Sequence, residues 1–252
     1  MAYREVVIAD SPAGYYRLDE SSGATFADSS GNSNTLTLSN VTQVLYSQSG
    51  LLTGDVNQCI KTTNTATFNG TVASPPTTLT TGITVECWFK CPTLPSGSAQ
   101  GGPYLIGTGA PSTWTLFLYS SGSGQPLQLR LTVNGYDYYS SISIDTIYHV
   151  VGIYDGSYFD VYVNNSIVQH VAKTQNYSGT VSSFYIVGYP GYYPRGVIID
   201  ELAYYTRALT TDEIAEHYGY GTGALIDPHG DSRPILRPKF NPTTQSIHRL
   251  GL

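Results

Sequence analysis

The sequence predicts an all-β fold, an antiparallel two-sheet sandwich with one short helix near the carboxyl end and an extended tail. Three observations lead to it: the composition, a two-residue alternation of side chains and regular turn signals. Among 252 residues, Tyr, Thr, Ser, Val, Ile and Gly dominate, with 22 tyrosines and 26 glycines, and Lys, Glu and Met are scarce. β-branched and aromatic residues favour strands and glycine favours turns. We therefore expect almost no helix.

Apolar and polar residues alternate with period two from residue 83 onward, which is typical of half-buried strands. In residues 83–89 the alternation predicts that Val85, Cys87 and Phe89 face one side and that Glu86 and Trp88 face the other. Further strands are expected at 114–119, 127–133, 148–154, 159–163, 166–171, 183–187 and 197–205.

Turn signals separate these strands. Asn134-Gly135 and Asp155-Gly156 are the strongest, because such pairs supply the positive φ values that tight hairpins need. Asn164-Asn165 and Gly122-Ser123-Gly124 are weaker signals of the same kind. Consecutive strands should therefore run antiparallel.

One helix is predicted near the end of the domain. Thr210 and Glu213 have the spacing of a capping box, and Ile214 and Tyr218 share one helical face. We expect a single short helix over 210–218.

The sequence divides into a domain, residues 1–220, and a tail, residues 221–252. A sandwich of this length folds as one unit with a sizeable core. In the tail, four prolines exclude regular strands and helices. The tail also holds five large apolar residues, Ile235, Leu236, Phe240, Ile247 and Leu250. We expect it to contact another chain and to make the protein an oligomer.

Charge and cysteine content restrict the class of partner and the compartment that the sequence predicts. Only 12% of residues are charged, the net charge is −6, and the 12 basic residues do not cluster in the body of the chain, which argues against a nucleic-acid partner. Three cysteines, Cys59, Cys87 and Cys91, are an odd set that we read as free thiols of a reducing compartment. The amino terminus lacks the pattern of an export signal, and no apolar run is long enough for membrane insertion.

Three segments in order resemble the laminin-G-like jelly-roll family of the concanavalin A-like lectin and glucanase superfamily. They are residues 8–32, beginning Ile-Ala-Asp-Ser-Pro-Ala-Gly-Tyr-Tyr; residues 83–90 with 148–164; and residues 199–214, beginning Ile-Asp-Glu-Leu-Ala-Tyr-Tyr. The resemblance spans residues 5–220 and implies a jelly-roll sandwich.

Catalytic signals are weak. Glucanases of this superfamily need two carboxylates directed into one sugar groove. Glu86 lacks a partner carboxylate, so a structural role is predicted for it. Asp200 and Glu201 are neighbours that are expected on opposite faces of a strand, so they cannot act together on one glycosidic bond. His149 alternates with Val151 and Ile153 and is predicted to be a core or inter-sheet histidine. We expect no enzyme activity.

Calcium is the metal that the sequence favours. The loop from Asp28 to Asn32 offers side-chain and backbone oxygens around a glycine, as calcium requires. The resemblance implies that such a loop can meet the Asp200 strand, which makes Asp28, Asn32 and Asp200 candidate ligands of a structural calcium ion. In the alternative reading, Asp28 and Asn32 only cap a turn.

Tyrosines form two clusters that we read as loops and as candidate ligand-binding sites. The first holds Tyr136, Tyr138 and Tyr139, and the second holds Tyr189, Tyr192, Tyr193 and Arg195. Loop tyrosines suit recognition because the ring offers a large contact area at low entropic cost. Glycans and proteins are both candidate partners.

Together these observations favour a non-catalytic, lectin-like attachment domain of a phage virion, in its tail or as a surface accessory protein, that recognises glycans or neighbouring virion proteins. The placement in a phage particle follows from resemblance. The alternatives are a secreted, extracellular carbohydrate-binding module and a purely structural virion subunit without sugar binding.

Overall fold

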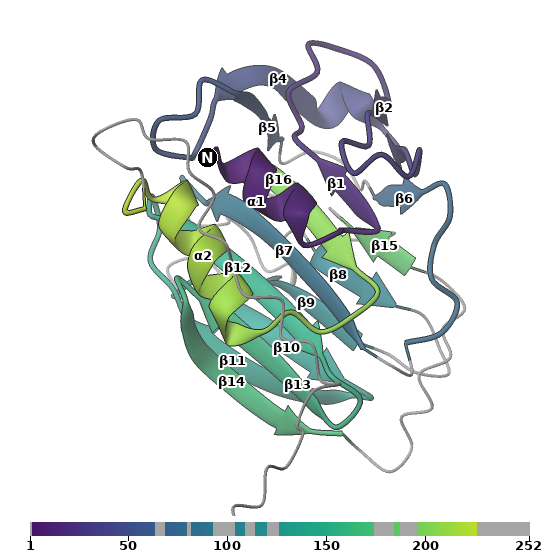
Figure 1. Cartoon of the computed structure of the whole chain (residues 1–252), viewed down its shortest axis with the longest axis vertical. Coiled ribbons are helices and arrows are strands. Elements are labelled where there is room, and N and C mark those ends of the chain that lie inside the picture. Colours follow the sequence, from purple (N-terminus) through teal and green to yellow (C-terminus); the bar gives the residue numbers. More distant parts are fainter. Residues whose placement is uncertain are drawn as a thin grey trace, which may run out of the picture.

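Two antiparallel sheets of eight strands each face one another, and two helices lie on the outside of one sheet (Figure 1). The computed structural model describes residues 2–63, 69–79, 82–92, 104–108, 114–119, 126–173, 184–186 and 196–225. The predicted two-sheet sandwich is confirmed, and so are the predicted strands from residue 83 onward.

Sheet A has the strand order β14-β13-β12-β7-β16-β5-β4, and β1 also pairs with β16. Its strands are β1 (Gly14–Tyr16), β4 (Val44–Ser49), β5 (Gln58–Thr62), β7 (Ile83–Lys90), β12 (Ile147–Tyr154), β13 (Tyr158–Val163), β14 (Ser166–Ala172) and β16 (Ile198–Tyr205). The edge strand β14 lies far from the edge strand β4.

Sheet B has the order β11-β10-β9-β8-β15-β6-β3-β2. Its strands are β2 (Thr25–Phe26), β3 (Leu36–Leu38), β6 (Gly70–Val72), β8 (Tyr104–Thr108), β9 (Trp114–Tyr119), β10 (Gln128–Val133), β11 (Tyr136–Ser141) and β15 (Phe184–Ile186). A 3-10 turn, η1 (Val41–Gln43), precedes β4. The short strands before residue 83 lack a clear alternation, and the sequence did not predict them apart from an opening strand.

The main core fills the space between the sheets. Val85, Cys87 and Phe89 of β7 belong to it, as the alternation predicts, together with Trp114 and Leu116 of β9. Packing here is close, because a Cβ added at Gly152 of β12 would lie 2.9 Å from Leu116. The three cysteines are buried and form no disulfide bond, in agreement with the prediction of thiols from the sequence.

The helices α1 (Tyr3–Ala9) and α2 (Thr211–Gly221) contact each other and cover the outer face of sheet A (Figure 1). A second apolar cluster forms there, and Tyr3, Val6, Trp88 and Ile214 belong to it. The capping box of α2 is confirmed, since Thr210 Oγ1 accepts from Glu213 N at 3.3 Å and Glu213 Oε2 accepts from Thr210 N at 2.7 Å. Neither helix, within the described chain, is long and apolar enough to cross a membrane.

Helix α1 was not predicted, and the expectation of a single helix was wrong. Its seven residues include four β-branched or aromatic side chains and follow an alanine N-cap without a side-chain acceptor. Such a sequence does not favour a helix in isolation. Tyr3, Val6 and Val7 lie on one side of the helix and are buried against sheet A, so tertiary packing stabilises it.

Two predicted hairpin turns formed with pairs of positive φ values, whereas in the Asp155-Gly156 turn between β12 and β13 only Gly156 has a positive φ, 100°. Asn134 and Gly135 have φ values of 45° and 85° between β10 and β11, and Asn164 and Asn165 have values of 49° and 62° between β13 and β14. These pairs of positive φ values are those of tight hairpins. The turn at Gly122-Ser123-Gly124 and the tail beyond residue 225 lie outside the described residues.

Candidate functional site

The β10–β11 hairpin carries the first tyrosine cluster. The prediction that these tyrosines lie in a loop is wrong, because Tyr136–Ser141 forms the edge strand β11, paired with β10 through six residues. Strand alternation then divides them: Tyr138 lies opposite Leu131 and packs against the core, whereas Tyr139 lies opposite Arg130 on the outer face. Tyr136 is 63% exposed and Tyr139 is 44% exposed.

Arg130 organises the outer face around Tyr139. Its guanidinium carbon lies 5.2 Å from the ring centres of Phe117 and Tyr119 and 5.7 Å from that of Tyr139, within range of cation–π attraction. The rings of Tyr119 and Tyr139 are 5.4 Å apart. We call Tyr119, Arg130, Asp137 and Tyr139 the tyrosine surface; Tyr136 alternates with Tyr138 and lies on the other face of β11.

Asp137 keeps Arg130 in place. Its carboxylate accepts hydrogen bonds from the Arg130 guanidinium and, at 2.7 Å, from Thr132 Oγ1. Burial would raise the pKa of Asp137, but the bonds to Arg130 and Thr132 outweigh burial and lower that pKa. The aromatic rings are therefore ordered before a ligand arrives, and the ion pair leaves the surface without net charge.

Next to this surface, the edge strands β11 and β14 of the two sheets meet (Figure 1). A shallow pocket of about 480 Å³ lies between them, which we call the seam pocket. It is lined by Tyr138, Tyr139, Val168, Gln169, His170, Val171 and Ala172. Gln169 Nε2 donates to Ser140 Oγ at 2.9 Å and so joins the two sheets across the seam.

His170 forms one rim of the seam pocket. Its ring stacks on Tyr158 with centroids 4.2 Å apart, and its Nδ1 lies 2.6 Å from Asp160 Oδ1. Together, the tyrosine surface and the seam pocket offer exposed aromatic faces, phenol hydroxyls and a few fixed polar groups. Recognition sites for small polar ligands combine these features.

The second tyrosine cluster, with Tyr189, Tyr192, Tyr193 and Arg195, lies outside the described residues. The prediction that it binds a ligand stays a prediction.

A second pocket of about 490 Å³ lies between the start of α1, residues 52–56 and Tyr220. The guanidinium of Arg17, in the wall of this pocket, already pairs with two carboxylates: its Nη2 lies 2.9 Å from Asp55 Oδ2 and its Nε lies 3.1 Å from Glu201 Oε1. The aromatic residues of this wall, Tyr3 and Tyr220, are buried. We therefore place the candidate binding site at the tyrosine surface.

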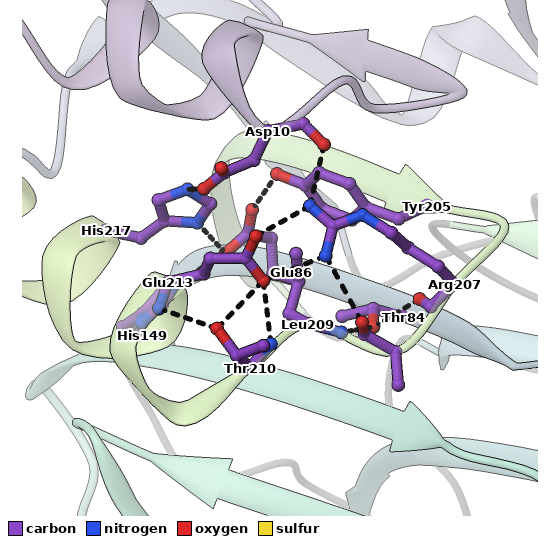
Figure 2. A network of polar contacts seen from close by, with 11 residues as sticks. Asp10, Thr84, Glu86, His149, Tyr205, Arg207, Leu209, Thr210, Glu213 and His217 are labelled. Carbon is purple, nitrogen blue, oxygen red and sulfur yellow. Dashed lines mark hydrogen bonds and ion pairs between the residues drawn. The ribbon is translucent and has the colours of Figure 1, made fainter. Parts of the chain in front are cut away.

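Beneath α2, a buried network joins the helices to sheet A (Figure 2). Glu86 Oε2 lies 3.0 Å from both His149 Nε2 and His217 Nδ1, and Glu86 Oε1 accepts from the Tyr205 hydroxyl at 2.6 Å. His217 Nε2 lies 3.1 Å from Asp10 Oδ2. We call Asp10, Glu86, His149, Tyr205 and His217 the helix clamp.

The protonation states in the helix clamp follow from its charges. Burial lowers the pKa of His217, but the Glu86 and Asp10 carboxylates outweigh it and raise that pKa to about 10. Burial raises the pKa of Glu86, but His217 and His149 hold it well below its usual range. Burial lowers the pKa of His149. A charged His217 donates from both nitrogens, and a neutral His149 donates only from Nε2.

This geometry gives Glu86 and His149 structural roles, in line with the sequence prediction. Both side chains are fully buried, and both Glu86 oxygens are occupied. An inter-sheet position for His149 is excluded, because it lies on the outer face of sheet A, stacked on Trp88 at 4.9 Å.

Asp200 and Glu201 were predicted to point to opposite faces of a strand, and this is wrong. Strand β16 bulges between Asp200 and Ala203, and Glu201 has a φ of 49°. Glu201 bonds the Tyr15 hydroxyl and Asp200 Oδ2 accepts from Leu51 N at 2.8 Å, so both carboxylates reach residues of the outer cluster. A bulge inserts one residue and breaks the alternation.

Burial governs both of these carboxylates. It raises the pKa of Glu201 to about 7, although bonds from Tyr15 and Arg17 oppose the shift, and it raises the pKa of Asp200, with help from the charge of Glu201.

The candidate calcium ligands hold backbone groups. Asp28 accepts from Tyr15 N at 3.0 Å, Ser30 N at 2.9 Å and Asn34 N at 2.8 Å. Asn32 Nδ2 donates to Pro12 O at 2.9 Å. Among the described residues, no group of three or more His, Cys, Asp and Glu side chains is placed to hold a metal ion. The contacts of Asp28 are those of the turn-capping alternative, and calcium binding stays a prediction.

Solved structures of toxins and a sialidase share this fold. The binding domain of Paraclostridial Mosquitocidal Protein 1 has a TM-score of 0.60 at 15% identity, with 84% of this chain and 52% of that chain covered. Botulinum neurotoxin type C has a TM-score of 0.57 at 12% identity, covering 85% and 52%. Trypanosoma rangeli sialidase has a TM-score of 0.59 at 17% identity, covering 87% and 34%. At these identities the likeness shows the fold alone.

This chain spans about half the length of the toxin chains and a third of the sialidase chain. No curated protein matches it by sequence. A laminin-G-type family model, described as the concanavalin A-like lectin/glucanases superfamily, matches residues 63–215. The chain therefore belongs to the concanavalin A-like lectin/glucanases superfamily.

Proposed function

We propose that this chain is a non-catalytic attachment domain that binds glycans through the tyrosine surface. The observation that carries the proposal is the exposed ring of Tyr139, on the outer face of an edge strand where Arg130 and Asp137 hold the neighbouring groups in place. Ordered aromatic side chains lose little entropy on binding, and their faces suit the C–H faces of sugar rings.

The structures that share this fold include proteins that attach to cells, which supports the proposal. One is the binding domain of a mosquitocidal protein, and another is the receptor binding domain of botulinum neurotoxin D. For botulinum neurotoxin type C, cell entry depends on interaction with two ganglioside molecules. This chain covers about half of each of these chains, so they support a role in attachment without showing which part binds the glycan.

The absence of enzyme activity is part of the proposal. Within the described residues, the buried carboxylates Glu86, Asp200 and Glu201 are occupied by protein partners or enclosed. A reducing-end assay on polysaccharides should give no turnover. Turnover that a single acidic substitution abolishes would overturn this part.

A place in a phage virion rests on the sequence resemblance, and none of the structures named above is a phage protein. Neighbouring virion proteins, a secreted carbohydrate-binding module and a structural subunit stay as alternatives. The binding surface does not distinguish a virion from a secreted module, so localisation stays a prediction.

A glycan array tests the proposed function. We expect the parent protein to bind a defined set of glycans, Tyr139→Ala to lose that binding and Tyr139→Phe to keep most of it, because the ring makes the contact. Leu45→Ala is the matched control. Leu45 is 47% exposed and lies on β4, the edge strand of sheet A that is far from β14 and from the tyrosine surface. An array without signal would favour the structural alternative, and signal that Tyr139→Ala leaves intact would overturn the proposal that the tyrosine surface is the glycan site.

A further inference from the structure

Charge is distributed unevenly between the two sheets. Sheet A carries charged side chains on several strands, and these include Lys61, Glu86, Lys90, Asp160 and Asp200. The described strands of sheet B contain two charged residues, Arg130 on β10 and Asp137 on β11. Between Cys91 and Ile144 the sequence has no other charged residue. The net charge of −6 therefore arises outside the strands of sheet B.

Around this pair, the outer face of sheet B is polar and uncharged. In β10, Leu129 and Leu131 belong to the core. The alternate residues Gln128 and Thr132 therefore lie on the outer face with Arg130. The residues that pair with these three on β9 and β11 are Thr115, Phe117, Tyr119, Asp137, Tyr139 and Ser141. Apart from one ion pair, the face offers a ligand rings and neutral hydroxyl, amide and phenol groups.

The ion pair cancels its own charge. Asp137 bonds the Arg130 guanidinium, and its Oδ1 accepts from Thr132 Oγ1 at 2.7 Å. Against the effect of burial, these bonds lower the pKa of Asp137, so the carboxylate stays ionised at neutral pH. An acidic ligand group that approaches Arg130 also meets Asp137, and attraction and repulsion nearly cancel.

The aromatic rings disfavour an acidic group as well. The guanidinium carbon of Arg130 lies 5.2 Å from the ring centre of Tyr119 and 5.7 Å from that of Tyr139, so the cation is already held among the rings. A ring face carries the negative part of the aromatic quadrupole and repels anions. An acidic group here gives up its hydration without gaining a partner.

We infer that the tyrosine surface selects uncharged glycans and that Asp137 sets this specificity. A neutral sugar ring lies against Tyr139 and exchanges hydrogen bonds with the surrounding uncharged groups. A sialic acid, uronic acid or sulfate group meets Asp137 and the ring faces instead. The inference rests on the proposed function and adds the class of glycan to it.

Matched pairs of glycans test the inference. An array carries neutral glycans beside their sialylated or sulfated forms, and lactose with 3′-sialyllactose serves as the pair for titration in solution. We expect the parent to bind the neutral member of a pair about fivefold or more tightly, the ratio for one close like-charge contact in water. Added salt should leave the binding of neutral glycans unchanged.

Asp137→Asn removes the specificity residue while keeping its size and an acceptor for Thr132. Arg130 is then uncompensated, so acidic members should gain about fivefold in affinity, and this gain should disappear in about 0.5 M salt. The double variant Arg130→Gln with Asp137→Asn has no charge and should keep the neutral preference. Melting temperatures show that each variant is folded.

Asp55→Asn is the matched control. Asp55 also pairs with an arginine, Arg17, and both side chains are 21% exposed, against 19% for Arg130 and 27% for Asp137. It precedes β5 at the other side of sheet A and changes the net charge equally, so it should leave the affinity ratio unchanged.

Equal or tighter binding of acidic members by the parent overturns the inference, and so does a ratio that Asp137→Asn leaves unchanged. In either case the proposed function stands if Tyr139→Ala weakens the glycans that bind. If no glycan binds in a Tyr139-dependent way, both proposals fail.

Discussion

The helix clamp and the tyrosine surface both place charged groups among aromatic rings, and they differ in what surrounds the charges. In the clamp, Glu86 and His217 are enclosed by two helices and a sheet, and their side-chain oxygens and nitrogens bond to other side chains of the protein. At the tyrosine surface, Arg130 and Asp137 bond each other, while Tyr139 is exposed to solvent. Only the second arrangement leaves aromatic area free for a ligand.

This difference shows that a cluster of titratable residues is a poor guide to function in this molecule. Glu86 with two histidines has the residue types of a catalytic site, yet its closure by α1 and α2 gives it a structural role (Figure 2). Perturbed pKa values arise in structural ion pairs as well as in active sites.

The largest expected effect comes from breaking the clamp. Glu86→Ala should lower the free energy of unfolding by about 3–5 kcal/mol, because it leaves the charged His217 buried beside Asp10 alone. Asp137→Ala is the comparison at the tyrosine surface, where a half-exposed pair contributes about 1 kcal/mol or less. Urea unfolding measures both, and equal losses would contradict the contrast between the two regions.

The clamp should also make stability depend on pH. The pKa of His217 is raised from 6.5 to about 10, so its contribution is complete below pH 6.5 and is lost as pH rises through 10. Glu86, with a lowered pKa, contributes above its ordinary value of 4.5 and loses that contribution in acid. Melting temperatures of the parent and His217→Gln should converge between pH 7 and 10, and parallel curves would argue against a charged His217.

The Asp28 loop distinguishes a cap from a calcium site. Asp28→Ala should cost about 2 kcal/mol, because three backbone N–H groups lose a charged acceptor. If the loop only caps a turn, EDTA leaves the melting temperature of the parent unchanged. If calcium binds Asp28, Asn32 and Asp200, EDTA lowers that temperature in the parent and has no effect on Asp28→Ala.

Tyr139→Ala should cost about 1 kcal/mol of stability, since it removes one exposed ring and one cation–π contact while Arg130 keeps Asp137. Chemical denaturation measures this loss, with Leu45→Ala as the control of similar exposure. A loss above about 3 kcal/mol would make Tyr139 a core residue and weaken its assignment to a binding surface.

Removing the tail should have the smallest effect on the domain. Leu225 N donates to Gly219 O at 3.1 Å and closes the turn after α2, so truncation is best placed after Leu225. We expect an unchanged melting temperature together with loss of oligomers in light scattering. A domain that unfolds on truncation while it still associates would contradict the predicted role of the tail in assembly.

The sequence by itself determined the fold class, most strands after residue 83 and the capped helix α2. These features depend on local chemistry: alternation sets the faces of Val85, Cys87 and Phe89, and Asn134-Gly135 supplies the φ values of a hairpin. It also identified the tyrosines of β11, from their number and clustering.

Only the tertiary structure decided which of these side chains are exposed and which charges meet. Helix α1 forms because sheet A buries Val6 and Val7, and Glu86 meets His217 across 131 residues of sequence. Because strand β16 bulges at Glu201, the side chains of Asp200 and Glu201 both reach the outer cluster, whereas strict alternation placed them on opposite faces. The seam pocket exists because β11 and β14, edge strands of different sheets, lie side by side, and no local pattern specifies that contact. Side-chain faces follow from neighbours in sequence, whereas burial, ion pairs and pockets depend on long-range packing.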